Sequence, residues 1–248
     1  MLRAAPLIFA ALALALWEAA VRLGHVPPYL LPGPAAIARA FLADPAGLLA
    51  ALLSTLAVTA AALGASCALG VLLALAMAAS RLARAAVLPW AVALQVTPVV
   101  AIAPLVIVWV GDPFLSLVVC ATVVAFFPVF SGMSAGLDAA PRELQDLFRL
   151  QGAGRWQTLR LLRLPAALPF FLAGLRVSGG LALVGAVVAE FVAGSGGFAS
   201  GLAYRILESG YRLQVPRMFA ALVLLALAGV AINAALGWLE HRLLRRRA

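Results

Sequence analysis

One charged stretch, residues 138–169, interrupts a chain that is otherwise almost wholly apolar. Its charged side chains are Asp138, Arg142, Glu143, Asp146, Arg149, Arg155, Arg160 and Arg163. A single charged residue at the middle of a bilayer costs about 2.5–3.5 kcal/mol, so a segment this polar cannot cross hydrocarbon. We therefore expect a loop in water that joins two membrane-spanning helices.

The residues of this loop predict a helix, a glycine turn and a second helix. Pro141 suits the first turn of a helix, because its missing N–H is not needed there. An apolar stripe follows at helical spacing, made of Leu144, Leu147 and Phe148. Gly152 and Gly154 should break the helix. The second helical run, residues 156–164, should end at Pro165 and Pro169. From periodicity alone, the hairpin either rests on lipid headgroups or docks a protein partner.

The spacing within the loop matches a known pattern: Glu-Ala-Ala, three residues, Gly, nine residues, Ile, one residue and Leu-Pro. In this chain Asp146 stands in place of Glu and Leu162 in place of Ile. Here the corresponding residues are Asp146, Leu147, Phe148, Gly152, Leu162, Leu164 and Pro165. In this respect the chain resembles the membrane subunits of ATP-binding-cassette importers. Leu147 and Phe148 depart from the two alanines, which affects how the helix would fit a partner's groove.

Other segments resemble the nitrate/sulfonate/taurine-type branch of these permeases, and the similarity runs from about residue 30 to the C-terminus. They are residues 98–105, Phe126-Phe127-Pro128, Leu168-Pro169, Gly174-Leu175-Arg176 and Ala189-Glu190-Phe191. The resemblance implies the type I importer permease fold. It also implies that residues of the loop couple the chain to an ATPase, namely Leu144, Asp146, Leu147, Phe148, Gly152, Leu162, Leu164 and Pro165.

The composition predicts an all-α, polytopic membrane helix bundle that forms one domain over residues 1–248. The chain is 65% hydrophobic and only 11% charged, against roughly 25% charged in soluble domains. We expect about six spans, near residues 6–21, 47–79, 85–110, 114–136, 169–192 and 219–238. The first could also be a cleavable signal peptide. Gln95, Thr97, Pro98 and Pro104 suggest that the third span is a kinked helix that faces protein.

The arginines predict which side of the membrane each loop occupies. On the six-span arrangement, twelve arginines fall on the side that holds both termini and the 138–169 loop, and five fall on the other side. The positive-inside bias places both termini and that loop in the cytoplasm. The basic tail, residues 241–247, is expected to contact anionic lipid rather than nucleic acid.

Catalytic chemistry is not expected of this chain. It contains no lysine, so it cannot form a standard phosphate-binding P-loop. His25 and His241 are its only histidines, and no metal-ligand spacing is present. Cys67 and Cys120 lie in apolar runs and are expected to be buried free thiols. We expect no bound cofactor or metal and no enzymatic activity.

The resemblance implies a permease subunit of an importer that works by alternating access in the bacterial inner membrane. Its implied partners are a second copy of the permease, two cytoplasmic ATP-binding subunits that carry ATP and Mg, and an extracytoplasmic solute-binding protein. The implied solute is a small anion, such as a sulfonate or nitrate, or a vitamin precursor. Candidate pathway or gating residues are Gln95, Thr97, Arg176, Ser178, Gly179 and Glu190.

A stand-alone, ion-coupled secondary transporter is the alternative, with Glu18, Arg176 and Glu190 on an ion path. Such folds usually contain duplicated halves with paired broken helices, and no such symmetry is evident in the sequence. The long inner loop favours the ATP-coupled importer.

Overall fold

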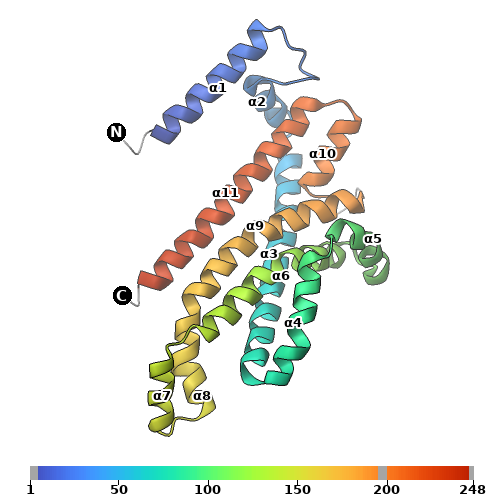
Figure 1. The fold of residues 1–248 in the computed structure, drawn as a ribbon. Helices are drawn as coiled ribbons and strands as arrows, with labels where there is room; N and C mark the ends of the chain where they lie inside the picture. Colours follow the sequence, from blue (N-terminus) through green and yellow to red (C-terminus); the bar gives the residue numbers. More distant parts are fainter. Residues whose placement is uncertain (1–4, 195–199, 246–248) are drawn as a thin grey trace. The chain divides into compact units, whose positions relative to one another are not determined.

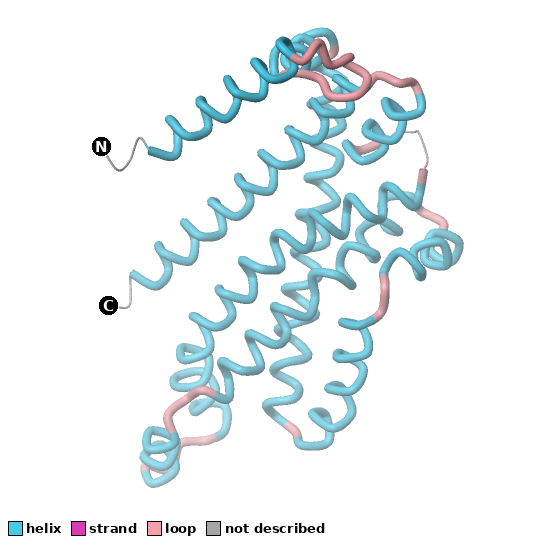
Figure 2. Tube along the Cα trace, turned by 45° about the horizontal axis from the view of Figure 1, so that its top comes forward, coloured by secondary structure: helices cyan, strands magenta, loops and turns pink. Residues whose placement is uncertain are grey.

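The computed structural model describes residues 5–194 and 200–245, and within them all regular structure is helical (Figures 1 and 2). Four helices are long and apolar enough to cross a membrane: α3 (Pro45–Ala79), α6 (Pro113–Asp138), Arg155–Ala193 and α11 (Val215–Arg245). The bent pair α4 (Arg81–Val96) and α5 (Val99–Val110) makes a fifth if it counts as one span. The first predicted span falls on α1 (Ala5–Leu23). The polytopic helical fold is therefore confirmed.

The chain forms two compact units, and two of its long helices contribute to both. Unit 1 comprises residues 1–55 and 194–227, and unit 2 comprises residues 56–193 and 228–248. The expectation of one transmembrane domain stays a prediction, and each unit is described by itself. Three positively charged residues used to orient the chain, Arg3, Arg246 and Arg247, lie outside the described residues, as do Ser195, Gly196 and Gly197.

Unit 1 packs α1, α2 (Pro34–Ala43), the start of α3, α10 (Leu202–Tyr211) and the start of α11. Its core contains Ile37, Leu48, Leu202, Ile206 and Ala221. Glu18 accepts a hydrogen bond from Arg22 at 2.7 Å, the pair that their spacing predicts, and another from the backbone N–H of Ala35 at 3.0 Å. This second bond ties α1 to the first turn of α2.

Unit 2 is built around α6 and α9 (Leu164–Ala193), which pack along one another (Figure 1). Small residues permit this close approach. A Cβ atom added at Gly132 would lie 2.7 Å from the Phe170 carbonyl oxygen, and one at Gly185 would lie 2.8 Å from Ala121 Cα. Ser178 adds an interhelical hydrogen bond from its Oγ to the Ala125 carbonyl oxygen at 2.6 Å. The result is a tightly packed pair that carries the 138–169 loop between its helices.

The third predicted span is not the kinked single helix that we expected. It is broken into α4 and α5, whose axes differ by 106°. Thr97 has an extended conformation with ψ 122°, as expected for a residue that precedes proline. Pro98 then caps the start of α5 and supplies no N–H that could continue α4. Internal Pro89 and Pro104 leave their helices intact, so a proline alone does not determine where a helix breaks.

The prediction that the second loop helix ends at Pro165 is also wrong. α8 (Arg155–Thr158) runs through a π-helical turn, η1 (Leu159–Arg163), directly into α9. The N–H of Leu164 bonds to the carbonyl of Leu159, five residues back. A wider turn of this kind relieves the clash between a proline ring and the preceding turn. Pro165 and Pro169 therefore lie within one continuous helical segment, Arg155–Ala193.

The charges between the fifth and sixth predicted spans, among them Arg205, Glu208 and Arg212, predict an outside loop, but residues 202–211 form α10. Leu202, Ala203, Ile206 and Ser209 are buried on one face of this helix. Thr55 Oγ1 accepts a hydrogen bond from the N–H of Leu202 at 2.9 Å and so caps α10 from α3. Elsewhere, the amphipathic run near residues 34–42 predicts a short helix, and it forms α2.

Candidate functional site

The first half of the 138–169 loop forms α7 (Arg142–Leu150), a charged helix with an exposed apolar stripe. Pro141 precedes it as the N-cap, and Glu143 and Arg149 have the signs that the helix dipole favours at each end. Leu144 and Leu147 are 43% and 48% exposed, whereas Phe148 is half-buried. An amphipathic helix of this kind presents an apolar face that the chain itself leaves uncovered.

A tight turn follows α7 and is built on Gly152. Its φ of +73° is in the left-handed region, which suits glycine because it has no Cβ. The N–H of Ala153 bonds to the Phe148 carbonyl at 2.9 Å, and the N–H of Gly152 bonds to the Arg149 carbonyl at 3.0 Å. These bonds close the helix end in the manner of a Schellman motif. The predicted arrangement of helix, glycine turn and helix is confirmed, with Gly154 as the N-cap of α8.

The second half of the loop pattern is anchored in the core of unit 2. Leu162 is 8% exposed, and Leu164 packs against a buried cluster that includes Ala74, Phe130, Leu137 and Ala167. The pattern thus divides into an outward part on α7 and an inward part on η1 and α9. The segment between the two parts, residues 151–158, is short and mostly exposed.

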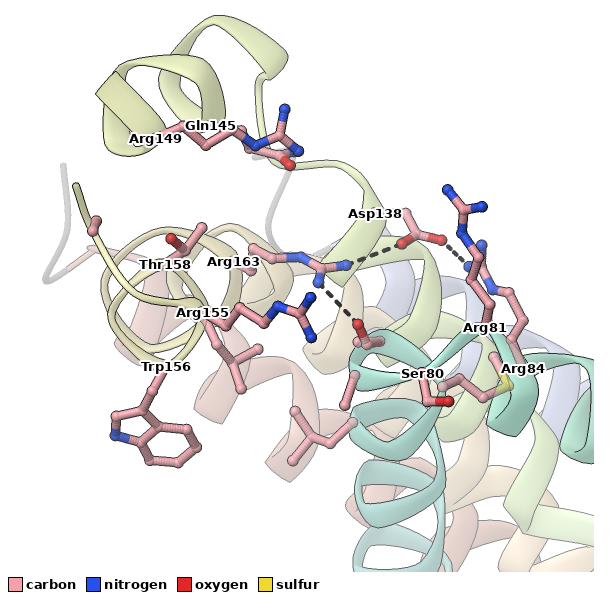
Figure 3. Close-up of a pocket in the computed structure, with 16 residues that line it drawn as sticks. Ser80, Arg81, Arg84, Asp138, Gln145, Arg149, Arg155, Trp156, Thr158 and Arg163 are labelled. Carbon is pink, nitrogen blue, oxygen red and sulfur yellow. Dashed lines mark hydrogen bonds and ion pairs between the residues drawn. The ribbon is translucent and has the colours of Figure 1, made fainter. Parts of the chain in front are cut away.

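A group of charges ties the loop to the ends of three helices (Figure 3). Asp138, at the end of α6, accepts hydrogen bonds from Arg84 of α4 and from Arg163 of η1, the latter at 3.2 Å. Arg163 also donates to the carbonyl oxygens of Leu137 at 2.9 Å and Ala78 at 3.4 Å. We call Arg84, Asp138 and Arg163 the loop-base cluster. From the sequence, Asp138 and Arg163 could be identified only as loop charges. Asp138 is 54 residues from Arg84 and 25 residues from Arg163, so neither pairing leaves a local signal in the sequence.

The candidate pathway residues occupy different environments. Gln95 is exposed near the end of α4, and Thr97 donates from Oγ1 to the Ala93 carbonyl at 2.8 Å. Ser178 and Gly179 are buried against neighbouring helices, with Leu236 of α11 next to Gly179. Glu190 is 3% exposed in α9. Their roles in a pathway stay predictions.

Arg176 has two partners on α11 that sequence reasoning missed. Its Nε donates to Asn233 Oδ1 at 2.8 Å, and its Nη1 lies 3.6 Å from Glu240 Oε2. The three side chains line a cavity of about 520 Å³ with Gly237, Trp238 and His241. Asn233 could have been noticed in the sequence, because it is a polar amide in the middle of the last apolar run. Because Glu240 offsets its charge, Arg176 gives little support to an anion site.

Within the described residues, no group of three or more His, Cys, Asp and Glu is placed to hold a metal ion.

The arrangement of helices is similar to that of a solved transporter chain. The match is to a crystal structure of an amino acid ABC transporter with histidines, with a TM-score of 0.65. It covers 79% of this chain and 93% of that chain at 18% sequence identity. At this identity the similarity concerns the fold alone.

Curated relatives match almost the whole chain. A probable ABC transporter permease protein of Haemophilus influenzae is 34% identical over 96% of this chain and 95% of its own length. The riboflavin transport system permease protein RibX of Chloroflexus aurantiacus is 37% identical over 96% of this chain and 88% of its own. The formylaminopyrimidine transport permease protein ThiX of Halalkalibacterium halodurans is 34% identical over 96% of this chain and 94% of its own length.

Residues 66–245 match the family model for the binding-protein-dependent transport system inner membrane component. Membership implies a multi-pass inner-membrane location and partners that comprise an ATPase and a solute-binding protein. It also implies a transport subunit that is not itself an enzyme. The chain belongs to this family, the permease subunits of binding-protein-dependent ATP-binding-cassette importers.

Proposed function

We propose that this permease acts as a homodimer with two ATPase subunits and docks each ATPase through α7. The observation that carries this proposal is the exposed leucine pair, Leu144 and Leu147, on a nine-residue helix that also carries four charged side chains. Short amphipathic helices of this kind bind by laying their apolar face into a groove of a partner. The glycine turn at Gly152 joins α7 to the segment whose Leu162 and Leu164 pack into the core of unit 2.

The coupling step follows from this anchoring. ATP binding would draw the two ATPase subunits together and move both α7 helices with them. Movement of α7 would reach α9 through η1 and reach α4 through the loop-base cluster, in which Asp138 contacts both Arg163 and Arg84. The break between α4 and α5 then becomes a natural hinge for opening the pathway outward to the binding protein. Hydrolysis would return the helices to their starting positions.

The proposed solute is a small heteroaromatic vitamin or vitamin precursor. This is supported by two of the three relatives described above that match over 96% of the chain, which are named for riboflavin and formylaminopyrimidine transport. A small sulfonate is the second candidate, because the putative aliphatic sulfonates permease SsuC of Bacillus subtilis is 32% identical over 62% of the chain. The pairing of Arg176 with Glu240 favours the heteroaromatic class, because it leaves less positive charge for an anion.

Docking is tested by co-purification of the full-length permease with candidate ATPase subunits from the same cells. Leu147→Asp should abolish co-purification, because a carboxylate in an apolar groove loses its hydration without a partner. The matched control is Leu213→Asp, which changes a leucine that is 77% exposed in unit 1 and should leave co-purification intact. Equal retention of the ATPase by both variants would overturn the assignment of α7 as the docking helix.

The solute is tested by uptake into proteoliposomes that contain the permease, its ATPase and its binding protein. We expect ATP-dependent accumulation of riboflavin or a formylaminopyrimidine and none of an alkanesulfonate. Accumulation of the sulfonate alone would replace the heteroaromatic class with the anionic one. Uptake driven by an ion gradient without any ATPase would contradict the importer mechanism itself.

A further inference from the structure

A cavity of about 1330 Å³ lies between the 138–169 loop and the turn that joins α3 to α4 (Figure 3). Five arginines contribute to its lining, namely Arg81, Arg84, Arg149, Arg155 and Arg163. Asp138 is the acidic residue among the lining side chains. The exposed leucines that we assign to ATPase docking, Leu144 and Leu147, are not part of this lining. The cavity is therefore a separate feature from the proposed docking stripe.

The cavity holds more positive charge than its acidic residues offset. Asp138 pairs with Arg84 and Arg163, and Arg149 pairs with Asp146 at 3.0 Å. Five guanidinium groups against these two carboxylates leave three positive charges. Within the part of the chain that the structure describes, neither Arg81 nor Arg155 has an acidic partner in an ion pair. These two side chains are available to a ligand.

The chemistry of the lining favours a phosphate group. The planar guanidinium presents paired N–H donors that match two phosphate oxygens, and charge-assisted bonds of this kind are about twice as strong as neutral ones. Arginines from different elements line the cavity: Arg81 begins α4, Arg155 begins α8 and Arg163 ends η1. A phosphate between them would bridge segments that are far apart in the sequence.

The cavity lies where apolar helices end. Ala79 is the last residue of α3 and Asp138 is the last residue of α6, and both helices are long and apolar enough to cross a membrane. Large apolar side chains nearby are exposed, with Trp156 at 69%, Leu161 at 63% and Leu82 at 80%. Tryptophan is enriched at headgroup level, and basic pockets at the cytoplasmic ends of spans bind acidic headgroups.

We propose that this cavity binds the phosphate of an acidic phospholipid headgroup, held by Arg81 and Arg155. The headgroup would join the loop, through α8, to the α3–α4 turn, and would reinforce the contact that Asp138 already makes. The proposal rests on the membrane location of the chain and not on ATPase docking, so its failure leaves the proposed function untouched.

The test measures lipid bound to the full-length protein by native mass spectrometry, with phosphatidylglycerol, phosphatidylcholine or inorganic phosphate added. We expect one tightly bound phosphatidylglycerol per chain and no comparable phosphatidylcholine adduct. Each arginine near an anionic lipid contributes about fivefold to binding, so Arg81→Gln with Arg155→Gln should lower occupancy about 25-fold. The matched control, Arg142→Gln with Arg160→Gln, removes the same charge from residues that do not line the cavity and should change occupancy less than threefold.

Two further arms keep the result decisive. Arg81→Lys with Arg155→Lys keeps the charge but loses the paired N–H donors, so its occupancy should lie between those of the wild type and the double glutamine variant. This intermediate value separates headgroup contact from misfolding of the double glutamine variant. Displacement of phosphatidylglycerol by inorganic phosphate at millimolar concentration would assign the arginines to a soluble phosphate and overturn the lipid as occupant. Equal losses in the cavity variant and the control variant would show nonspecific attraction and overturn the site.

Discussion

Arg163 and Asp138 form an ion pair at 3.2 Å that joins the π-helical turn to the end of α6. The pair is reinforced by the bond from Arg163 to the Leu137 carbonyl at 2.9 Å. Because Asp138 also contacts Arg84, one carboxylate lies between the loop and the start of α4. The charged interruption in the sequence is thus fixed to the helical bundle at its base.

Asp138→Asn should reduce ATP-driven uptake severalfold while stability falls by only about 1 kcal/mol. Its side chain is 45% exposed, and ion pairs in such positions contribute about 0–1 kcal/mol each. Reconstituted uptake and thermal unfolding measure the two effects. Asp44→Asn is the control, since Asp44 pairs with Arg217 within unit 1 and should lower stability without lowering uptake. Unchanged uptake by the Asp138 variant would remove this residue from the coupling path.

Gly152→Ala should loosen the turn after α7, because an alanine at φ +73° is strained by about 1–2 kcal/mol. Limited digestion with trypsin measures this, since Arg149 and Arg155 flank the turn. We expect cleavage in the loop to become at least about fivefold faster. Gly154→Ala, two residues away, is the control, because Gly154 has a φ of −66° and an added methyl group would make only an ordinary contact with Gln157 Oε1 at 3.8 Å. Equal digestion rates in both variants would show that the backbone at Gly152 carries no constraint.

Gly174→Ala should destabilise the chain by about 1–3 kcal/mol, because its methyl group would overlap the Pro128 carbonyl oxygen on α6. Gly180→Ala is the control on the same helix, where no atom lies within 4 Å of the added Cβ. Thermal unfolding in detergent compares the two variants. A similar midpoint for both would mean that α6 and α9 separate easily.

The orientation of the chain can be tested by cysteine labelling after Cys67 and Cys120 are replaced by alanine. An impermeant maleimide should label Arg142→Cys only from the cytoplasmic side, because the arginine distribution places the 138–169 loop there. Leu213→Cys, between α10 and α11, should be labelled only from the opposite side. Both variants reacting from the same side would contradict the predicted topology.

The sequence predicted the elements whose signal is local and periodic. The charged loop, its stripe at Leu144 and Leu147 and its turn at Gly152 follow from residue spacing and from the conformational freedom of glycine. The spans could be placed because hydrocarbon tolerates few charges, although the predicted spans are shorter than the helices that the structure contains. α10 was missed although Leu202 and Ile206 are four residues apart, because the surrounding charges suggested a loop.

Proline effects and distant polar pairs could not be predicted in this way. Pro98 marks a break of 106° whereas Pro165 lies in a continuous helical segment. The difference depends on the backbone bonds around each ring, here the π turn before Pro165. The pairing of Arg176 with Asn233 joins residues 57 apart, and only the packing of α9 against α11 brings them together.

The loop pattern has an exposed half and a buried half, and different requirements act on the two: partner binding on the exposed half and folding on the buried half. Leu162 and Leu164 are constrained by the packing inside unit 2, whereas about half of the Leu147 surface is left open to a partner. Substitutions on α7 can therefore accumulate without loss of the bundle. If α7 docks the ATPase as we propose, a permease built in this way could exchange one ATPase subunit for another, and the same nine residues are where a new pairing would be designed.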